Sequence, residues 1–134
     1  MVRVFLGMVG FAYLALALWC SFSPESTARA VGFTLIPGAG QSEFLTVYGG
    51  LEFALGVLFL WPVVQRSDPK YSLVVCLVIH ASLVAFRSLG FLLFDGLGGT
   101  TYSLAATEWV ILLGSAILTL KLRRGESPAR PREN

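Results

Sequence analysis

Residues 71–94, YSLVVCLVIHASLVAFRSLGFLLF, form a long apolar stretch that contains a single charged side chain, Arg87. The stretch is long enough to cross a bilayer, because about 20 helical residues at a rise of 1.5 Å span a hydrocarbon core of about 30 Å. A charge in that core costs roughly 2.5 to 3.5 kcal/mol, so a buried arginine is expected to have a partner. The stretch therefore predicts a membrane helix and a buried polar contact.

Three further apolar runs predict a membrane protein. They cover residues 4–22, 44–64 and 102–120. The chain of 134 residues is 55% hydrophobic and only 13% charged, with a mean hydropathy of +0.73, which is too apolar for a soluble domain. Four crossings nearly exhaust this length and leave no room for a soluble catalytic domain. We expect an all-α, integral membrane antiparallel four-helix bundle over residues 1–124, followed by a disordered cytoplasmic tail at 125–134.

Loop charges predict how the bundle is oriented. All lysines and arginines of the loops and termini fall at one end, except Arg29. The residues at the basic end are Arg3, Arg66, Lys70, Lys121, Arg123, Arg124, Arg130 and Arg132. By the positive-inside rule both termini are cytoplasmic, and we expect a multi-pass protein of the bacterial inner (plasma) membrane. The segment 23–43, which is expected to begin with a turn at 23–26, and the short turn 95–101 then face outward.

Two glutamates lie inside neighbouring runs at depths that match that of Arg87. Counted at 1.5 Å per residue from the outward end, Arg87 and Glu108 lie about 10 Å deep and Glu52 lies about 13 Å deep. An arginine side chain can tilt along its helix to cover that difference. We therefore predict a buried network of Glu52, Arg87 and Glu108 that joins three helices.

Two more polar residues are expected beside this network. Tyr48 lies one helical turn before Glu52 and can supply a hydroxyl, and His80 lies two turns before Arg87 on the same stripe. Two carboxylates around one guanidinium leave one excess negative charge. One proton is therefore expected to be shared within the cluster, or His80 to be protonated.

Small residues on the face of Glu52 indicate close helix packing. Gly49, Glu52 and Gly56 follow the spacing i, i+3, i+7, which places them on one side of a helix. On the fourth run a weak polar stripe begins at Thr101, near the outward surface. We expect a water-accessible cleft that opens outward, with the segment 23–43 as its cover.

The remaining residues carry no recognisable catalytic motif. Cys20 and Cys76 are expected near opposite ends of their helices, beyond the Cα distance of about 7 Å that a disulfide allows, so both are predicted to be buried thiols. One histidine and two separated cysteines make no metal site. There is no phosphate loop, dinucleotide fingerprint or nucleophile elbow, and nothing indicates nucleic-acid binding. The expected partners are the lipid bilayer and a larger membrane complex or a second copy of the chain.

The stretch VYGGLEFALG at Val47–Gly56, the R-x-x-G at Arg87–Gly90 and the single glutamate Glu108 carry a family resemblance. Together they resemble the small bacterial four-helix membrane proteins catalogued as domain of unknown function 4345, over roughly residues 4–124. That group is more distantly similar to DoxX-like proteins, some of which are membrane subunits associated with quinone-linked oxidation. The resemblance implies that Glu52, Arg87 and Glu108 match the family's polar pattern, and it implies no established activity.

Three functions stay open at this point. The leading hypothesis is a non-enzymatic accessory or lipid- or small-molecule-binding protein, because a catalytic motif and a soluble domain are missing; a buried ionic cluster can also be purely structural. The alternative is a small membrane enzyme or redox-complex subunit acting on a quinone-like or lipid-like molecule. In it, Glu52 or Glu108 moves protons and Arg87 holds a ligand oxygen. The third is an oligomeric transporter. No cofactor is identified by motif, and a quinone or a lipid is the ligand type considered.

Overall fold

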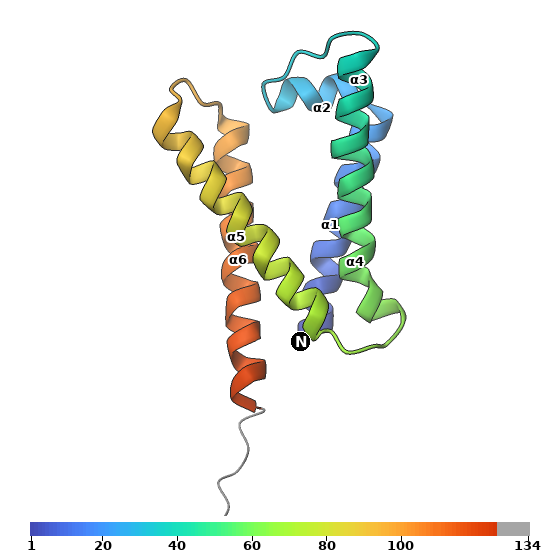
Figure 1. Cartoon of the computed structure of the whole chain (residues 1–134), viewed down its shortest axis with the longest axis vertical. Helices are drawn as coiled ribbons and strands as arrows, with labels where there is room; N and C mark the ends of the chain where they lie inside the picture. Colours follow the sequence, from blue (N-terminus) through green and yellow to red (C-terminus); the bar gives the residue numbers. More distant parts are fainter. Residues whose placement is uncertain (126–134) are drawn as a thin grey trace, which may run out of the picture.

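The computed structural model describes residues 1–125, which form helices joined by short connections and contain no strand (Figure 1). Four helices are long and apolar enough to cross a membrane. The predicted all-α, multi-pass architecture is thus confirmed. The tail predicted at 125–134 lies outside the described residues, apart from Gly125, which is the last residue of the fourth span.

The four spans have the bounds that follow. The second span is a continuous run of three helices with a π-helical segment in the middle, and it begins earlier than the predicted residue 44. The spans are α1 (Val2–Phe22), then α3 (Ala39–Phe44) with η1 (Leu45–Leu51) and α4 (Glu52–Val64), then α5 (Lys70–Leu93) and α6 (Gly99–Gly125).

A short helix, α2 (Pro24–Ala30), occupies the start of the segment that was expected to begin with a turn. Proline suits the first position of a helix, where its missing N–H leaves no hydrogen bond unmade. The Thr27 hydroxyl donates to the carbonyl oxygen of Ser23 at 2.9 Å and closes the first turn. The predicted turn at 23–26 was therefore wrong, because Pro24 begins a helix here.

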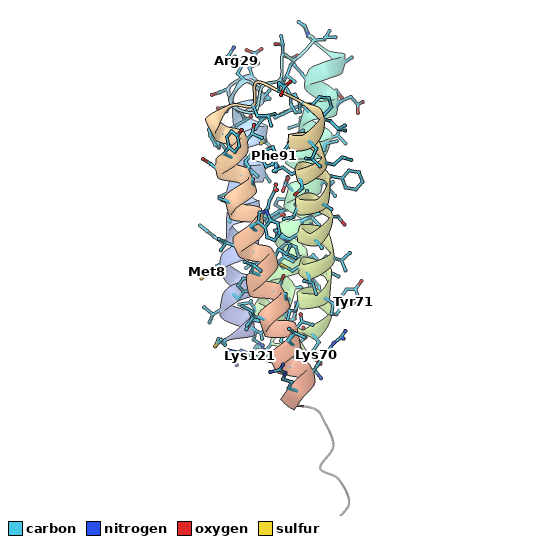
Figure 2. All side chains as sticks on the ribbon, turned by 90° about the vertical axis from the view of Figure 1, so that its left-hand side faces the viewer. Met8, Arg29, Lys70, Tyr71, Phe91 and Lys121 are labelled. Carbon is cyan, nitrogen blue, oxygen red and sulfur yellow. The ribbon has the colours of Figure 1, made fainter. Side chains whose placement is uncertain are left out.

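The spans form two antiparallel hairpins. The first hairpin pairs α1 with η1 and α4, the second pairs α5 with α6, and most of the helix packing lies within each hairpin. Figure 1 shows the hairpins converging at the end that holds the N-terminus and diverging toward the end that holds α2 and α3. Figure 2 shows Lys70 and Lys121 at the convergent end and Arg29 at the divergent end. We call these the basic end and the α2–α3 end.

The main hydrophobic core lies where the hairpins converge. All four spans contribute to it, through Leu6, Val9, Phe59, Leu73, Cys76 and Leu118. A second, smaller cluster at the α2–α3 end is built from Cys20, Ala28 and Phe44 and involves no buried residue of α5 or α6. The hairpins therefore share a core at the basic end only. Both cysteines are free and buried, as predicted.

Helices α1 and α4 cross in close contact at two glycines. A Cβ added to Gly10 would lie 2.9 Å from the carbonyl oxygen of Gly56, and one added to Gly56 would lie 3.0 Å from the carbonyl oxygen of Gly10. A Cβ at Gly10 would be closer to backbone than real Cβ atoms come, and one at Gly56 would also lie 2.7 Å from the Leu14 side chain, so both positions favour glycine at this crossing. The small-residue face predicted around Gly56 thus packs against α1, and Gly49 adds a third close approach, to Ser21.

Substitution of Gly10 by alanine should destabilise the first hairpin. The added methyl group meets backbone that cannot move cheaply, and overpacking of this kind costs about 1 to 3 kcal/mol. Unfolding by SDS in mixed micelles, followed by circular dichroism, measures the loss. The control is Gly90→Ala in α5, where a Cβ meets nothing within 4 Å and alanine favours the helix. Equal stability of the two variants would contradict the close crossing.

Candidate functional site

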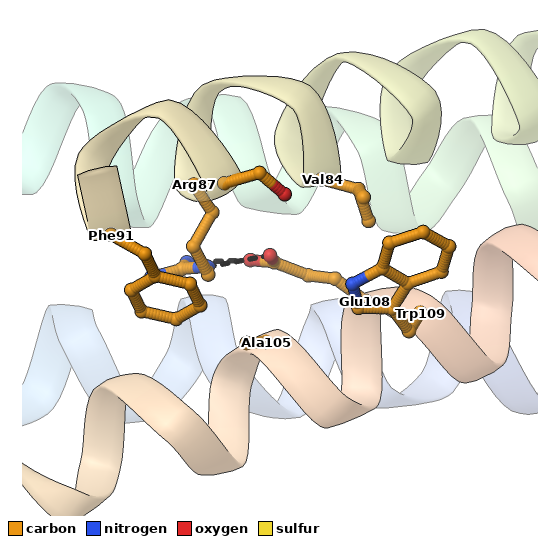
Figure 3. A pocket seen from close by; sticks show the side chains of 7 residues that line it. Val84, Arg87, Phe91, Ala105, Glu108 and Trp109 are labelled. Atoms are coloured by element: carbon orange, nitrogen blue, oxygen red, sulfur yellow. Dashed lines mark hydrogen bonds and ion pairs between the residues drawn. The ribbon is translucent and has the colours of Figure 1, made fainter.

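Arg87 and Glu108 form a bidentate ion pair between α5 and α6 (Figure 3). The Nε of Arg87 donates to Oε2 of Glu108 and its Nη2 donates to Oε1, both at 2.6 Å. The two side chains are 26% and 12% exposed. Fork-to-fork pairing is the strongest arrangement of these two groups. The predicted contact between Arg87 and Glu108 is therefore confirmed.

The ion pair is closely packed by its own hairpin. Figure 3 shows the rings of Phe91 and Trp109 beside it, and the space that these side chains line together with Val84 and Ala105 is too small for a water molecule. Phe91 also stacks on Tyr102 of α6, with 5.4 Å between ring centroids. The pair thus holds α5 against α6 and leaves no room for a ligand between its two charges.

Glu52 does not join this pair. Within residues 1–125 its carboxyl group makes no hydrogen bond or ion pair, and its Oε2 atom is buried without a hydrogen-bond partner. The predicted three-residue network is therefore not formed. Depth along the membrane normal matched Glu52 to Arg87, but the hairpins that carry them diverge on this side of the core (Figure 1). A buried carboxyl oxygen left unpaired costs on the order of 1 to 3 kcal/mol, so it requires an explanation.

A π-helix leads directly into Glu52. The seven residues of η1 include Gly49, where a Cβ would lie 2.7 Å from the Oγ of Ser21 in α1. The close approach to α1 thus lies within the π-helical segment. Such turns are rare and are frequent at functional sites.

Tyr48 lies within this π-helix and packs on Phe44, with 4.5 Å between stacked rings. Its hydroxyl makes no hydrogen bond with any described residue. Tyr48 interacts electrostatically with both Glu52 and Arg87, which lie on different hairpins. The Tyr48 hydroxyl, which was predicted to join the network, is therefore bonded neither to Glu52 nor to the Arg87–Glu108 pair.

His80 is bound to Tyr13 of α1 instead of the Arg87 pair. The Nδ1 atom lies 2.8 Å from the Cys76 carbonyl oxygen, which can only accept, so Nδ1 carries the proton. In the neutral ring Nε2 then accepts from the Tyr13 hydroxyl at 3.2 Å. The histidine is 1% exposed and lies where the hairpins converge. Its main role here is to join two helices.

Sequence reasoning missed Tyr13, although a signal was present. Tyr13 and His80 each lie about ten residues from the basic end of their helices, so the depth matching used for Arg87 also pairs them. Tyr13 interacts electrostatically with Glu52 and Glu108, one from each hairpin. Tyr13 thus connects the two hairpins through His80 and interacts with a glutamate of each.

The site can hydrogen-bond a ligand, and nothing in it holds a metal. No group of three or more His, Cys, Asp or Glu side chains suited to a metal ion occurs in the described part of the chain. What remains is a carboxyl group with a buried, unused oxygen, the Tyr48 side chain that interacts with it electrostatically, and, on the other hairpin, an ion pair in which both oxygens of Glu108 are used. The unused oxygen is the group in this site that lacks a hydrogen-bond partner within residues 1–125.

Comparisons with known proteins assign no family to this chain. A scan against protein-family models found no match, and searches of the curated proteins and of the solved structures found none. The resemblances to the domain-of-unknown-function 4345 proteins and to DoxX-like proteins therefore stay predictions.

A double-mutant cycle should show that Arg87 is coupled to Glu108 and not to Glu52. Arg87→Met and Glu108→Met each leave an unpaired charge, so together they should cost less than the sum of the single effects by roughly 1 to 3 kcal/mol. Arg87→Met combined with Glu52→Met should be additive within about 0.5 kcal/mol. Unfolding in mixed micelles measures each term. A larger coupling for the second pair would contradict the geometry.

Proposed function

We propose that this chain is a non-enzymatic accessory membrane protein that binds a lipid-like or quinone-like molecule through Glu52. The observation that carries the proposal is the buried Oε2 atom of Glu52, which has no hydrogen-bond partner. Buried polar atoms in folded proteins are almost always paired, so an orphan atom indicates a partner from outside the chain. A ligand that hydrogen-bonds this carboxyl group would remove the cost of leaving it unpaired.

The surroundings of Glu52 favour a ligand with an apolar body and one polar group. The residue lies inside an apolar span of 26 residues, so a molecule reaches it most directly through the bilayer. A hydroxyl group on that molecule can donate to the carboxylate, and a carbonyl group can accept from the protonated acid. Hydroxylated lipids and the quinone–quinol pair offer these groups.

In this proposal Arg87 has a supporting role, in place of the ligand-anchoring role that the sequence suggested. Two of its N–H groups are committed to Glu108 in a space that excludes water. The pair fixes α5 against α6, and the guanidinium that it holds interacts electrostatically with Tyr48 of the other hairpin. Loss of Arg87 should therefore weaken the fold first and ligand binding as a consequence.

The contact between Tyr13 and His80 favours a second candidate, a membrane enzyme or redox-complex subunit that moves a proton. The Tyr13 hydroxyl reaches His80 and interacts electrostatically with Glu52. A proton released by a ligand hydroxyl to Glu52 would find the next acceptors at Tyr13 and His80. This candidate predicts that Tyr13→Phe keeps ligand binding and loses turnover, whereas a binding protein has no turnover to lose.

We also propose that the protein resides in a bacterial inner membrane with both termini in the cytoplasm. The support is the charge asymmetry of the spans. Lysine and arginine residues gather at the end that holds the N-terminus, the connection between α4 and α5 and the last turn of α6, while the opposite end has Arg29 alone.

Replacement of Glu52 by alanine should release the bound molecule without unfolding the protein. Native mass spectrometry of protein extracted gently from its membrane should show a small-molecule adduct on the wild type and at least tenfold less on Glu52→Ala, because a hydrogen bond to a charged group contributes about 1.5 to 3 kcal/mol. Glu43→Ala, an exposed glutamate of the same span, is the matched control and should keep the adduct. An empty wild-type protein would contradict the proposal.

Cysteine labelling tests the orientation. Glu25→Cys in α2 should react with a membrane-impermeant maleimide on intact spheroplasts, and Asp68→Cys, between α4 and α5, should react only after lysis. The native Cys20 and Cys76 are buried and serve as the unlabelled background. The reverse pattern would place the termini outside.

A further inference from the structure

A cavity of about 370 Å³ lies between the two hairpins at the α2–α3 end. One wall is formed by residues 29–32, at and just after the end of α2, and the other wall is formed by residues 96–98, 100 and 101. Neither Glu52 nor Arg87 lines it. Its volume falls in the range of about 300 to 1,000 Å³ that is typical of small-molecule sites. The cavity is thus large enough for a ligand of its own.

The charge of the cavity is positive because of Arg29. It is the one charged residue in the lining, and its guanidinium makes no hydrogen bond or ion pair within the described residues. Glu25 and Asp95 are the acidic residues that precede the two walls in sequence. Neither lines the cavity, and Glu25 accepts a hydrogen bond from Gln41. Arg29 is also the exception to the charge asymmetry of the loops. Its five donors are therefore available to an anion.

The facing wall adds hydrogen-bonding groups and open space. Thr100 and Thr101 bring two hydroxyls. Gly96 and Gly98 leave the backbone bare, since a Cβ added to either would meet nothing within 4 Å. A planar guanidinium matches the oxygens of a phosphate in two parallel hydrogen bonds, and hydroxyl groups can satisfy the remaining oxygens.

The cavity lies at the edge of the apolar spans. α1 ends at Phe22 and α5 at Leu93, and α6 begins at Gly99, so the lining residues lie at or just beyond the ends of the spans, where a bilayer would place its lipid phosphates. We propose that this cavity binds a phosphate group, supplied by a phospholipid of the bilayer or by free phosphate. The site is separate from Glu52, so it stands or fails independently of the proposed function.

Calorimetric titration of the purified full chain in detergent tests the proposal. Short-chain phosphatidylglycerol should bind at least tenfold more tightly than the diacylglycerol with the same acyl chains, which lacks only the phosphoglycerol head group. Arg29→Gln should weaken phosphatidylglycerol binding by about tenfold or more, because it removes charge-assisted hydrogen bonds. Lys121→Gln, a charge removal at the basic end, should leave this affinity unchanged.

A filling variant tests the cavity itself. Gly98→Leu should occupy it and abolish binding, while Gly99→Leu, next in sequence and outside the lining, should not. Competition by inorganic phosphate would identify free phosphate as a source, and binding of the lipid alone would identify the bilayer. Circular dichroism confirms that each variant is folded. Binding that is unchanged by Arg29→Gln and Gly98→Leu, or a wild-type protein that binds neither phosphate form, would overturn the proposal.

Discussion

An arginine can lie inside an apolar helix only if its charge is balanced and its N–H groups are hydrogen-bonded. In this protein Glu108 balances the charge and accepts hydrogen bonds of 2.6 Å from two of the five N–H groups of Arg87, whose side chain is 26% exposed. Because both oxygens of Glu108 are used in this way, the pair joins α5 to α6 as one unit. It also leaves Glu52, on the other hairpin, without the cation that its position in the sequence suggested. Glu52 is the candidate site because Arg87 is paired with Glu108 instead.

The rest of the fold keeps the two hairpins distinct. Gly10 and Gly56 bring α1 and α4 into backbone contact, and the shared core is confined to the basic end, where Tyr13 also bonds His80 across the hairpins. Beyond that point the hairpins diverge (Figure 1), and the π-helix of the first hairpin leads directly into Glu52. Glu52 thus carries a buried polar atom for which residues 1–125 supply no hydrogen-bond partner.

Much of the fold was predictable because the lengths of the apolar runs and the positions of the charges can be read directly from the sequence. The four spans, the buried thiols and the contact of Arg87 with Glu108 all follow from run lengths and depths. Depth gives no lateral position, which is why Glu52 was assigned wrongly to the same network. The small-residue face predicted the close packing of Gly49, but nothing in the local sequence indicated that residues 45–51 form a π-helix. The short helix α2 was missed because Pro24 can end a helix or begin one.

The central claim is that Arg87 is paired with Glu108 alone and that Glu52 has no partner within the described chain. Solid-state NMR of the protein in lipid bilayers, with ¹⁵N in arginine side chains and ¹³C in glutamate carboxyl groups, measures this directly. Spectra of the Glu52→Gln and Glu108→Gln variants assign the signals. The account predicts a strong dipolar coupling between the Arg87 guanidinium and a carboxyl carbon that disappears in Glu108→Gln and persists in Glu52→Gln. Loss of that coupling in Glu52→Gln would contradict it.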